Sequence, residues 1–452
     1  MDDPRHPEQR LPGQGGTDWA AGSRRLSGAR AAAKRRATYP DEWLKPTRQL
    51  QTKMRPITTV ILTLALMASS ALSAAASEAG YRVPPMRNDG WRTAHAETMG
   101  VDPERLAALS AAVRARPDWN VHAILIERKG QLIYEAYFDG EDAHFGMPLG
   151  KVPMTADSMH DLQSINKSVV SALVGIALRD GIIASLDQPL IDWFKEYPDL
   201  DTPARRRVKL AHALSMSAGF DWNEDLSLTD PRNDQLRIFQ EARPLHHALS
   251  RPIVAEPGSV FRYNGALTQV MVAVVERAAK MPLREYARTK LFEPLGIVDV
   301  EWLGSLGAGD LPAPWLRLHP RDLAKFGSLY LHGGQWNGRQ VIPADWIEQS
   351  TRRHVRVPSP PGVQSENGYG YYWWYFCAPG PTGVTEQRAA IGDGGQRVHV
   401  YPGLQMVVTI LAGRYNDPDP GSFGVIKPIM REHILPAVKS DVGTGCPGAK
   451  TP

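Results

Sequence analysis

Segments with the composition of β-strands lie at both ends of the main body of this chain. Near its start, residues 122–138 (HAILIERKGQLIYEAYF) form two apolar runs around a Lys-Gly pair, which is typical of a β-hairpin. Near its end, residues 369–376, 396–402 and 406–413 are rich in β-branched and aromatic side chains between Gly and Pro. This arrangement predicts an α+β fold, in which one sheet is assembled from both ends of the chain around a helical insertion.

The segments between these strands have helical patterns. We predict helices in residues 160–178, 266–281, 283–296, 319–334 and 425–438, because their apolar residues recur at helical spacing and Gly or Pro ends several of them. The length of 452 residues permits several domains or one large α/β unit with a subdomain.

The N-terminal region differs in composition from the body. Residues 1–53 are rich in Arg, Pro, Gly and Ala, and we expect them to be disordered or to lie upstream of a true translation start at Met54. Residues 54–76 have a basic start, an apolar stretch and a small-residue end, the pattern of a signal peptide cleaved near Ala76. The protein is then exported, to the periplasm or beyond. The alternative is that residues 57–76 stay uncleaved as a membrane anchor.

The positive charge of the chain is confined to that extension. Residues 1–53 hold eleven Lys or Arg and six Asp or Glu, whereas the whole chain has a net charge of +4. The body is therefore close to neutral, at about −1, and lacks the concentrated basic face that nucleic-acid binding requires. We expect no nucleic-acid partner.

A Ser-x-x-Lys pair opens the apolar helix at residues 160–178. Serine caps helices well and a lysine one turn later reaches solvent, so Ser164 and Lys167 have a purely structural interpretation. They also have a chemical one, because positions i and i+3 share a helix face and a neighbouring base can activate a serine hydroxyl. The chain has no Gly-x-Ser-x-Gly, His-Glu-x-x-His, Gly-x-Gly-x-x-Gly or phosphate-binding loop, which leaves Ser164-x-x-Lys167 as the leading catalytic element. We expect no metal and no cofactor.

Five longer motifs carry a family resemblance. They occur in this order: DLQSINKSVVSALVGIAL, VKLAHALSMSAGFDW, EPGSVFRYNGALTQVMVAVVERAAKM, LRLHPRDLAKFGSLYLHGGQWNGRQVIPADWI and IGDGGQRVHVYPGLQMVVTI. From about Asp89 to Ala437 the chain resembles the serine β-lactamase-like hydrolases, which include class C β-lactamases, D-alanyl-D-alanine carboxypeptidases, esterases and 6-aminohexanoate-dimer hydrolases. The resemblance implies a mainly antiparallel sheet flanked by helices, with an inserted all-helical subdomain. We place the hydrolase domain at residues 77–440, that subdomain at roughly 155–318, and a flexible tail at 441–452.

The resemblance also implies roles for single residues. Ser164 resembles the acylated nucleophile, Lys167 its base, and Tyr263 the tyrosine that passes the proton to the leaving group. The backbone amides of Ser164 and Gln396 would form the oxyanion hole. Gly394 and Gly395 would then let a substrate approach the strand backbone closely.

Two positions depart from the family pattern and bear on substrate choice. Asn264 follows Tyr263 directly, whereas the family motif is often Tyr-x-Asn, so its substrate-binding amide is displaced by one position. The third motif begins with Asp393 where relatives often have Lys or His. The resemblance then implies a small ester, amide or peptide-like substrate, with the esterase or amidase type favoured. A β-lactamase or carboxypeptidase, and a catalytically weak binding relative, are the alternatives.

Other residues have open or structural interpretations. Cys377 and Cys446 form one disulfide or remain as two free thiols. Tyr369 and Tyr371 either wall the cleft or, as we favour, pack within the sheet. His160, His319 and His399 are expected to be packed or surface imidazoles and not members of a catalytic triad.

Overall fold

The computed structural model describes residues 80–226, 230–305, 312–358, 367–381, 383–417, 421–439 and 446. The predicted extension and the signal peptide or anchor lie outside these residues, and so does the predicted tail except for Cys446. Across the described ranges, no helix is both long and apolar enough to cross a membrane.

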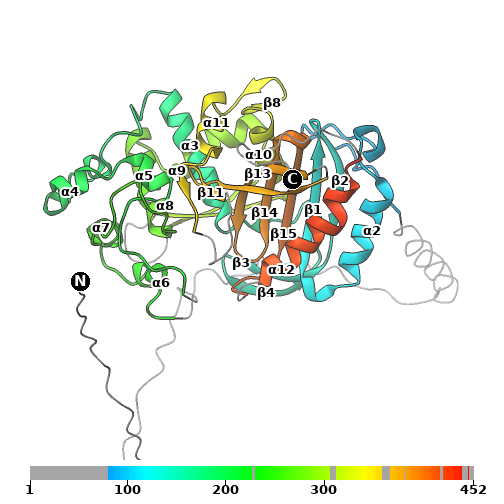
Figure 1. Cartoon of the computed structure of the whole chain (residues 1–452), viewed down its shortest axis with the longest axis horizontal. Coiled ribbons are helices and arrows are strands. Elements are labelled where there is room, and N and C mark those ends of the chain that lie inside the picture. The colour runs from blue at the N-terminus through cyan, green and yellow to red at the C-terminus, as the bar shows by residue number, and fades with distance from the viewer. Residues whose placement is uncertain are drawn as a thin grey trace, which may run out of the picture. The chain divides into compact units, whose positions relative to one another are not determined.

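One antiparallel sheet is built from both ends of the chain, as predicted (Figure 1). Among the described residues it has eight strands, and the two N-terminal strands lie beside the last C-terminal one. In spatial order they are β10 (Val355–Arg356), β11 (Gly368–Tyr369), β12 (Trp374–Gly380), β13 (Gly383–Gly392), β14 (Gln396–Tyr401), β15 (Met406–Ala412), β1 (Val121–Arg128) and β2 (Gln131–Tyr137).

Both faces of this sheet are buried. All residues of β1 are buried, and their side chains alternate between two apolar cores: Ala123 and Leu125 belong to one, Ile124 and Ile126 to the other. This follows from the two-residue period of a strand, which sends successive side chains to opposite faces. A sheet of this kind needs helices on both sides.

The covering helices lie on opposite faces. α10 (Pro320–Leu331) packs against β14, β15 and β1 and contributes to the first core. α2 (Pro103–Arg114) and α12 (Gly421–Pro428) contribute to the second core, and both lie beside β1 and β15 in Figure 1. A π-helical segment, Ile429–Ile434, and α13 (Leu435–Ala437) extend α12, so the helix predicted at residues 425–438 is present.

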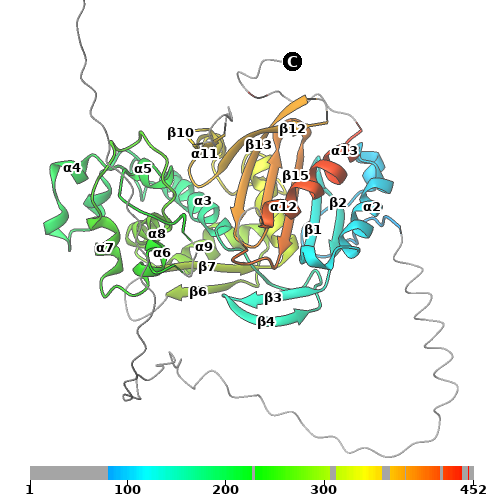
Figure 2. The same cartoon turned by 60° about the horizontal axis from the view of Figure 1, so that its bottom comes forward.

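The insertion forms a helical group beyond the sheet (Figure 2). It contains α3 (Ile165–Arg179), α4 (Pro203–Arg206), α5 (Leu210–Leu214), α6 (Asp234–Ile238), α7 (Pro244–Ser250), α8 (Gly265–Ala279) and α9 (Leu283–Ala287), with α8 in contact with α3, α5 and α7.

The range predicted for the helical subdomain, roughly residues 155–318, is not helical throughout. That range also holds a small sheet of β5 (His160–Asp161), β7 (Pro312–Leu318) and β6 (Glu301–Ser305). β5 has only two residues and β7 contains proline, and neither shows a clear alternation of apolar and polar residues. Their pairing therefore depends on their tertiary neighbours. Further short elements outside that range are the hairpin of β3 (Gly140–His144) and β4 (Met147–Val152), the hairpin of β8 (Gln335–Trp336) and β9 (Arg339–Gln340), and α11 (Ala344–Thr351).

The strand predicted at residues 369–376 is interrupted. β11 ends at Tyr369 and β12 begins at Trp374. Between them Tyr372 has a φ of +61°, and its amide donates to the carbonyl of Leu214 instead of to a strand. The backbone therefore leaves the sheet for a few residues to bond the helical group, a contact that local composition does not encode.

Cys377 and Cys446 form a disulfide, with their Cα atoms 5.9 Å apart. This decides between the two alternatives that the sequence left open. Cys446 is also buried, so the expectation of a flexible tail at residues 441–452 fails at this residue.

Candidate active site

The candidate nucleophile lies in a tight turn at the start of α3. Gln163, the residue before it, has a φ of +52°, a conformation that is uncommon for a residue with a side chain. A Cβ added at Gly392, at the end of β13, would lie 2.5 Å from the carbonyl oxygen of Leu162. Glycine at this position therefore allows the end of β13 to contact the turn, which brings Ser164 next to the third motif.

Ser164 does not cap α3 through its side chain. Its hydroxyl instead accepts a hydrogen bond from Nζ of Lys167, at 3.1 Å. This contact puts Nζ within reach of the hydroxyl proton, as nucleophile activation requires, whereas the capping interpretation of the serine required a bond to the backbone.

Tyr263 completes a group of three side chains. It lies in the loop before α8, and Nζ of Lys167 is 5.0 Å from the centre of its ring. The ring also stacks on Trp374, with centroids 6.2 Å apart and an interplanar angle of 20°. The helical group and the sheet thus jointly place the tyrosine over the lysine.

A cavity of about 550 Å³ opens above these residues. Its walls come from the tight turn before α3, the first helical turn of α3, the helical group, the small sheet and the β13–β14 turn. They include Ser164, Lys167, Tyr263 and Asp393. The structure therefore brings four of the predicted site residues to one surface.

The other predicted residues lie behind this surface. Asn264 is buried, and its side chain caps α8 by accepting from the amide of Leu267, at 3.3 Å. The displacement of this asparagine by one position has therefore turned a predicted binding residue into a helix cap. The side chain of Gln396 is buried and donates to the carbonyls of Asp393 and Ala412.

Gly394 and Gly395 form the turn between β13 and β14, with φ of +80° and +100°. Both values lie in the region that favours glycine. The part that the amides of Ser164 and Gln396 play in an oxyanion hole stays a prediction.

The two tyrosines considered as walls of the cleft do not line the cavity. Tyr369 and Tyr371 are buried in aromatic packing, the latter stacked on His354 with centroids 3.9 Å apart. The packing interpretation is therefore correct for both. Trp374 lines the cavity instead.

The histidines considered as triad members serve no such role here. His160 and His399 are buried, and burial lowers the pKa of His399 to about 3. His319 is half-buried, 3.8 Å from a carboxylate oxygen of Asp299. None of the three lines the cavity.

Three amide side chains in the cavity wall were missed in the sequence. Asn166, Gln235 and Gln269 line the cavity, and each has a buried side-chain oxygen with no hydrogen-bond partner among the described residues. Buried polar atoms are nearly always bonded, so these oxygens mark hydrogen-bonding capacity that the described residues leave unused. Asn166 could have been found from its place inside the Ser-x-x-Lys pair, whereas nothing local marks the two glutamines.

Both signs of charge line the cavity. Asp161 and Asp417 are ion-paired with Arg317 and Arg414, while Glu224 accepts hydrogen bonds from the indole of Trp222 and the amide of Gly265.

Asp393 is exposed, and one of its oxygens accepts from the amide of Asn416, at 2.9 Å. Arg397 is buried beneath it and donates to the carbonyls of Gly392 and Gln396, each at 2.8 Å. Burial lowers the pKa of Arg397 to about 10, opposed by the charge of Asp393. At the position where relatives often have a cation, this chain has the carboxylate of Asp393, and the buried Arg397 also lines the cavity.

Comparison with known sequences identifies the family. The profile of the family described as Beta-lactamase matches residues 109–423. The chain belongs to this family. The matched range lies within the hydrolase domain predicted at residues 77–440.

Several curated relatives of this β-lactamase-family chain are named as hydrolases or esterases. A 6-aminohexanoate-dimer hydrolase of Paenarthrobacter ureafaciens is 25% identical over 282 residues, which cover 58% of this chain and 68% of the relative. Esterase EstB of Burkholderia gladioli is 29% identical over 185 residues, covering 39% of this chain and 45% of the esterase. The chain is thus similar to about half the length of that esterase and to two thirds of the dimer hydrolase.

Solved structures share the fold. EstCE1, described as a hydrolase with promiscuous acyltransferase activity, has a TM-score of 0.57 at 18% identity and covers 75% of this chain and 98% of its own. A putative 6-aminohexanoate-dimer hydrolase from Bacillus anthracis has a TM-score of 0.56 at 18% identity, and the match covers 71% of this chain and 80% of that one. The predicted fold class and the assignment as a serine hydrolase of the β-lactamase fold are confirmed.

Proposed function

We propose that this chain is an exported hydrolase that cleaves an ester or amide bond through a covalent acyl-enzyme on Ser164. The observation that carries this proposal is the 3.1 Å contact between Nζ of Lys167 and Oγ of Ser164 at the floor of a cavity. Export rests on the signal-peptide pattern alone.

The proposed reaction has two halves. Oγ of Ser164 attacks the substrate carbonyl carbon while its proton passes to Nζ of Lys167, and the bond to the leaving group breaks as that group takes a proton by way of Tyr263. Water then attacks the ester formed on Ser164, releases the acid and restores the serine proton. The start of α3 adds a favourable field for the negative oxygen of each intermediate.

The substrate is proposed to be neutral or amine-bearing. The exposed carboxylate of Asp393 repels a substrate carboxylate, and the unpaired oxygens of Asn166, Gln235 and Gln269 accept hydrogen bonds from a donor-rich acyl or leaving group. β-Lactams and D-alanyl peptides present a carboxylate beside the scissile bond, so both are expected to be poor substrates.

Covalent labelling tests the nucleophile. Intact-protein mass spectrometry after exposure to a fluorophosphonate should show one adduct, which peptide mapping places on Ser164. Ser164→Ala should lose both labelling and turnover, and Lys167→Ala should lose nearly as much because the two side chains act as one unit.

Ser171→Ala is the matched control. Ser171 lies on α3 as well, but its side chain is buried and does not line the cavity. Labelling in this variant should be unchanged. An adduct that persists in Ser164→Ala would refute the assignment.

A further inference from the structure

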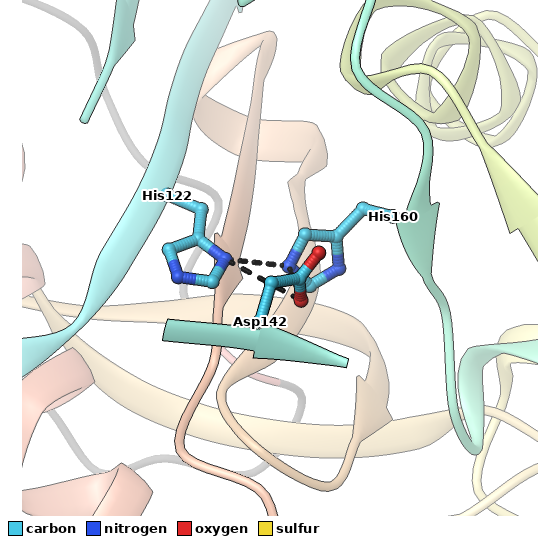
Figure 3. A group of neighbouring side chains, drawn as sticks. All are labelled: His122, Asp142 and His160. Atoms are coloured by element: carbon cyan, nitrogen blue, oxygen red, sulfur yellow. Dashed lines mark hydrogen bonds and ion pairs between the residues drawn. The ribbon is translucent and has the colours of Figure 1, made fainter. Parts of the chain in front are cut away.

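Three buried side chains from three different strands meet away from the cavity (Figure 3). They are His122 on β1, Asp142 on β3 and His160 on β5, and each side chain is at most 2% exposed. Nδ1 of His122 lies 2.8 Å from Nε2 of His160, while Oδ1 of Asp142 is 3.8 Å and 3.5 Å from these two nitrogens. A buried carboxylate and two imidazoles converge at one point.

The tautomer of His122 is fixed by Asn120. The side-chain amide of Asn120 is oriented by the backbone of Glu141, which donates to Oδ1 at 2.9 Å and accepts from Nδ2 at 2.8 Å. Oδ1 therefore faces Nε2 of His122, at 3.3 Å. Because an oxygen acceptor requires a donor, the proton of His122 lies on Nε2 and its Nδ1 is bare.

The tautomer of His160 is fixed in the same way. Its Nδ1 is 3.0 Å from the carbonyl oxygen of Asp161, so Nδ1 carries the proton and Nε2 is bare. In the neutral state, the two inner nitrogens then present lone pairs to each other at 2.8 Å. Such a contact is repulsive unless a cation lies between them.

A shared proton satisfies this contact less well than a metal ion. It would turn one buried ring into a charged imidazolium and bridge only the two nitrogens, whereas a metal ion can bind both nitrogens and the carboxylate of Asp142 together. The outer nitrogens bonded to oxygen acceptors, by contrast, are the usual support of metal-bound histidine.

The distances also fit a tetrahedral ion. Ligand atoms about 2.0–2.1 Å from zinc lie roughly 3.3–3.4 Å from one another. The three distances among the His and Asp donor atoms are 2.8, 3.5 and 3.8 Å, which lie on both sides of the tetrahedral value. The hydroxyl of Tyr415 supplies a fourth position, 3.0 Å from Oδ1 of Asp142 and 3.5 Å from Nε2 of His160.

We infer that His122, Asp142 and His160 form a structural site for a divalent transition-metal ion, with zinc the best match to two imidazoles and a carboxylate. These three residues are dispersed along the sequence, so no local spacing marks them as a group.

The site has a positioning role for the active-site turn. His160 precedes Ser164 by four residues, and β5 runs into the turn that holds the nucleophile. Tyr415 packs against Gly394, where an added Cβ would lie 2.6 Å from its ring. An ion at this site would tie β1 and β3 to the two segments that form the catalytic turn and the third motif.

Metal content and spectroscopy test the inference on the full chain, purified without a histidine tag. Elemental analysis should find about one zinc per chain after dialysis against a weak chelator. Protein refolded with Co²⁺ in place of zinc should show visible absorption bands of a four-coordinate site, and refolding with a strong chelator should lower the melting temperature.

Single substitutions should locate the ion. Asp142→Asn and His122→Gln should each reduce bound metal at least tenfold and remove the cobalt bands. His246→Gln is the matched control, since His246 also contacts a carboxylate, that of Asp199 at 2.7 Å, but at the surface and without a second histidine. It should retain full occupancy.

Two results would overturn the inference, and neither depends on catalysis. One is wild-type protein that binds neither zinc nor cobalt and melts at the same temperature with and without chelator; the cluster is then a proton-sharing network. The other is unchanged metal content in folded Asp142→Asn or His122→Gln. Should both variants fail to fold, the cobalt spectrum and chelator response of the wild type decide.

Discussion

At the scale of single residues, the proposed chemistry depends on the hydroxyl group of Tyr263 and on the charge of Asp393. Oγ of Ser164 lies 3.1 Å from Nζ of Lys167, which lies 5.0 Å from the centre of the Tyr263 ring. Asp393 is exposed and lines the cavity, so a substitution there changes the charge of the cavity wall with little effect on packing. Testing the hydroxyl group and testing the charge therefore require different substitutions.

Removing only the hydroxyl of Tyr263 should separate its chemistry from its packing. Tyr263→Phe keeps the ring that stacks on Trp374, so the melting temperature should change little. Turnover of a neutral aryl ester should fall by about 10²–10⁴, the range for a positioned acid–base group. A near-normal rate in this variant would move the proton-transfer role to another group.

Reversing the charge at Asp393 should change which substrate is preferred. In Asp393→Lys, kcat/KM for an anionic cephalosporin should rise about tenfold relative to a neutral aryl ester, because about 1.4 kcal/mol of changed electrostatic energy is enough for that factor. Asp393→Asn should give a smaller change of the same sign.

Steady-state kinetics on both substrates measure this ratio. Asp417→Asn is a useful comparison, because Asp417 lines the same cavity but is already paired with Arg414. A cephalosporin that is the better substrate in the wild type, or a ratio that Asp393→Lys leaves unchanged, would contradict a role for charge at this position.

At the scale of helices and strands, close backbone approaches position the nucleophile. α3 packs against α11 at Gly175, where an added Cβ would overlap the indole ring of Trp346. The end of β13 approaches the turn before α3 at Gly392. The absence of a side chain at these two positions sets where α3 begins and how it lies on the sheet.

A methyl group at Gly175 should therefore destabilise the fold. We expect Gly175→Ala to reduce the free energy of unfolding by about 1–3 kcal/mol, as overpacking does in dense cores. Gly424→Ala is the control: Gly424 is also helical, but a Cβ there would have no atom within 4 Å.

The control should be neutral or stabilising by up to about 1 kcal/mol, because alanine favours the helix. Urea unfolding of the two variants gives the comparison. Equal stability of both would show that α3 and α11 can separate at no cost.

At the scale of the whole described chain, the disulfide links strand β12 to a residue near the C-terminus. Cys377 and Cys446 are separated by 69 residues, and the enclosed segment includes β13, β14 and β15. Closing a loop of this length removes many conformations of the unfolded chain, worth about 4 kcal/mol in the chain-entropy account.

The double variant Cys377→Ser/Cys446→Ser should accordingly lower the melting temperature. The loss should be matched by the wild type in a reducing agent, and a reducing agent should not affect the variant. Calorimetry on the four samples measures this. A wild type that melts at one temperature in both conditions, with its disulfide shown to be reduced, would contradict the expected contribution.

The sequence determined the elements whose signals are local. Apolar and β-branched runs at the two ends of the chain mark β1 and β15, and helical spacing marks α8 and α10. The Ser-x-x-Lys pair is local as well, since i and i+3 meet on any helix. Fold class and the two central site residues could therefore be predicted without coordinates.

Tertiary structure alone decided what distant segments do together. The break at Tyr372 depends on a hydrogen bond from its amide to the carbonyl of Leu214. His122, Asp142 and His160 lie on strands from three places in the chain, so no spacing could identify them as neighbours. The physical reason is the same in each case: these contacts join residues far apart in sequence, and their energies depend on packing that only the complete fold supplies.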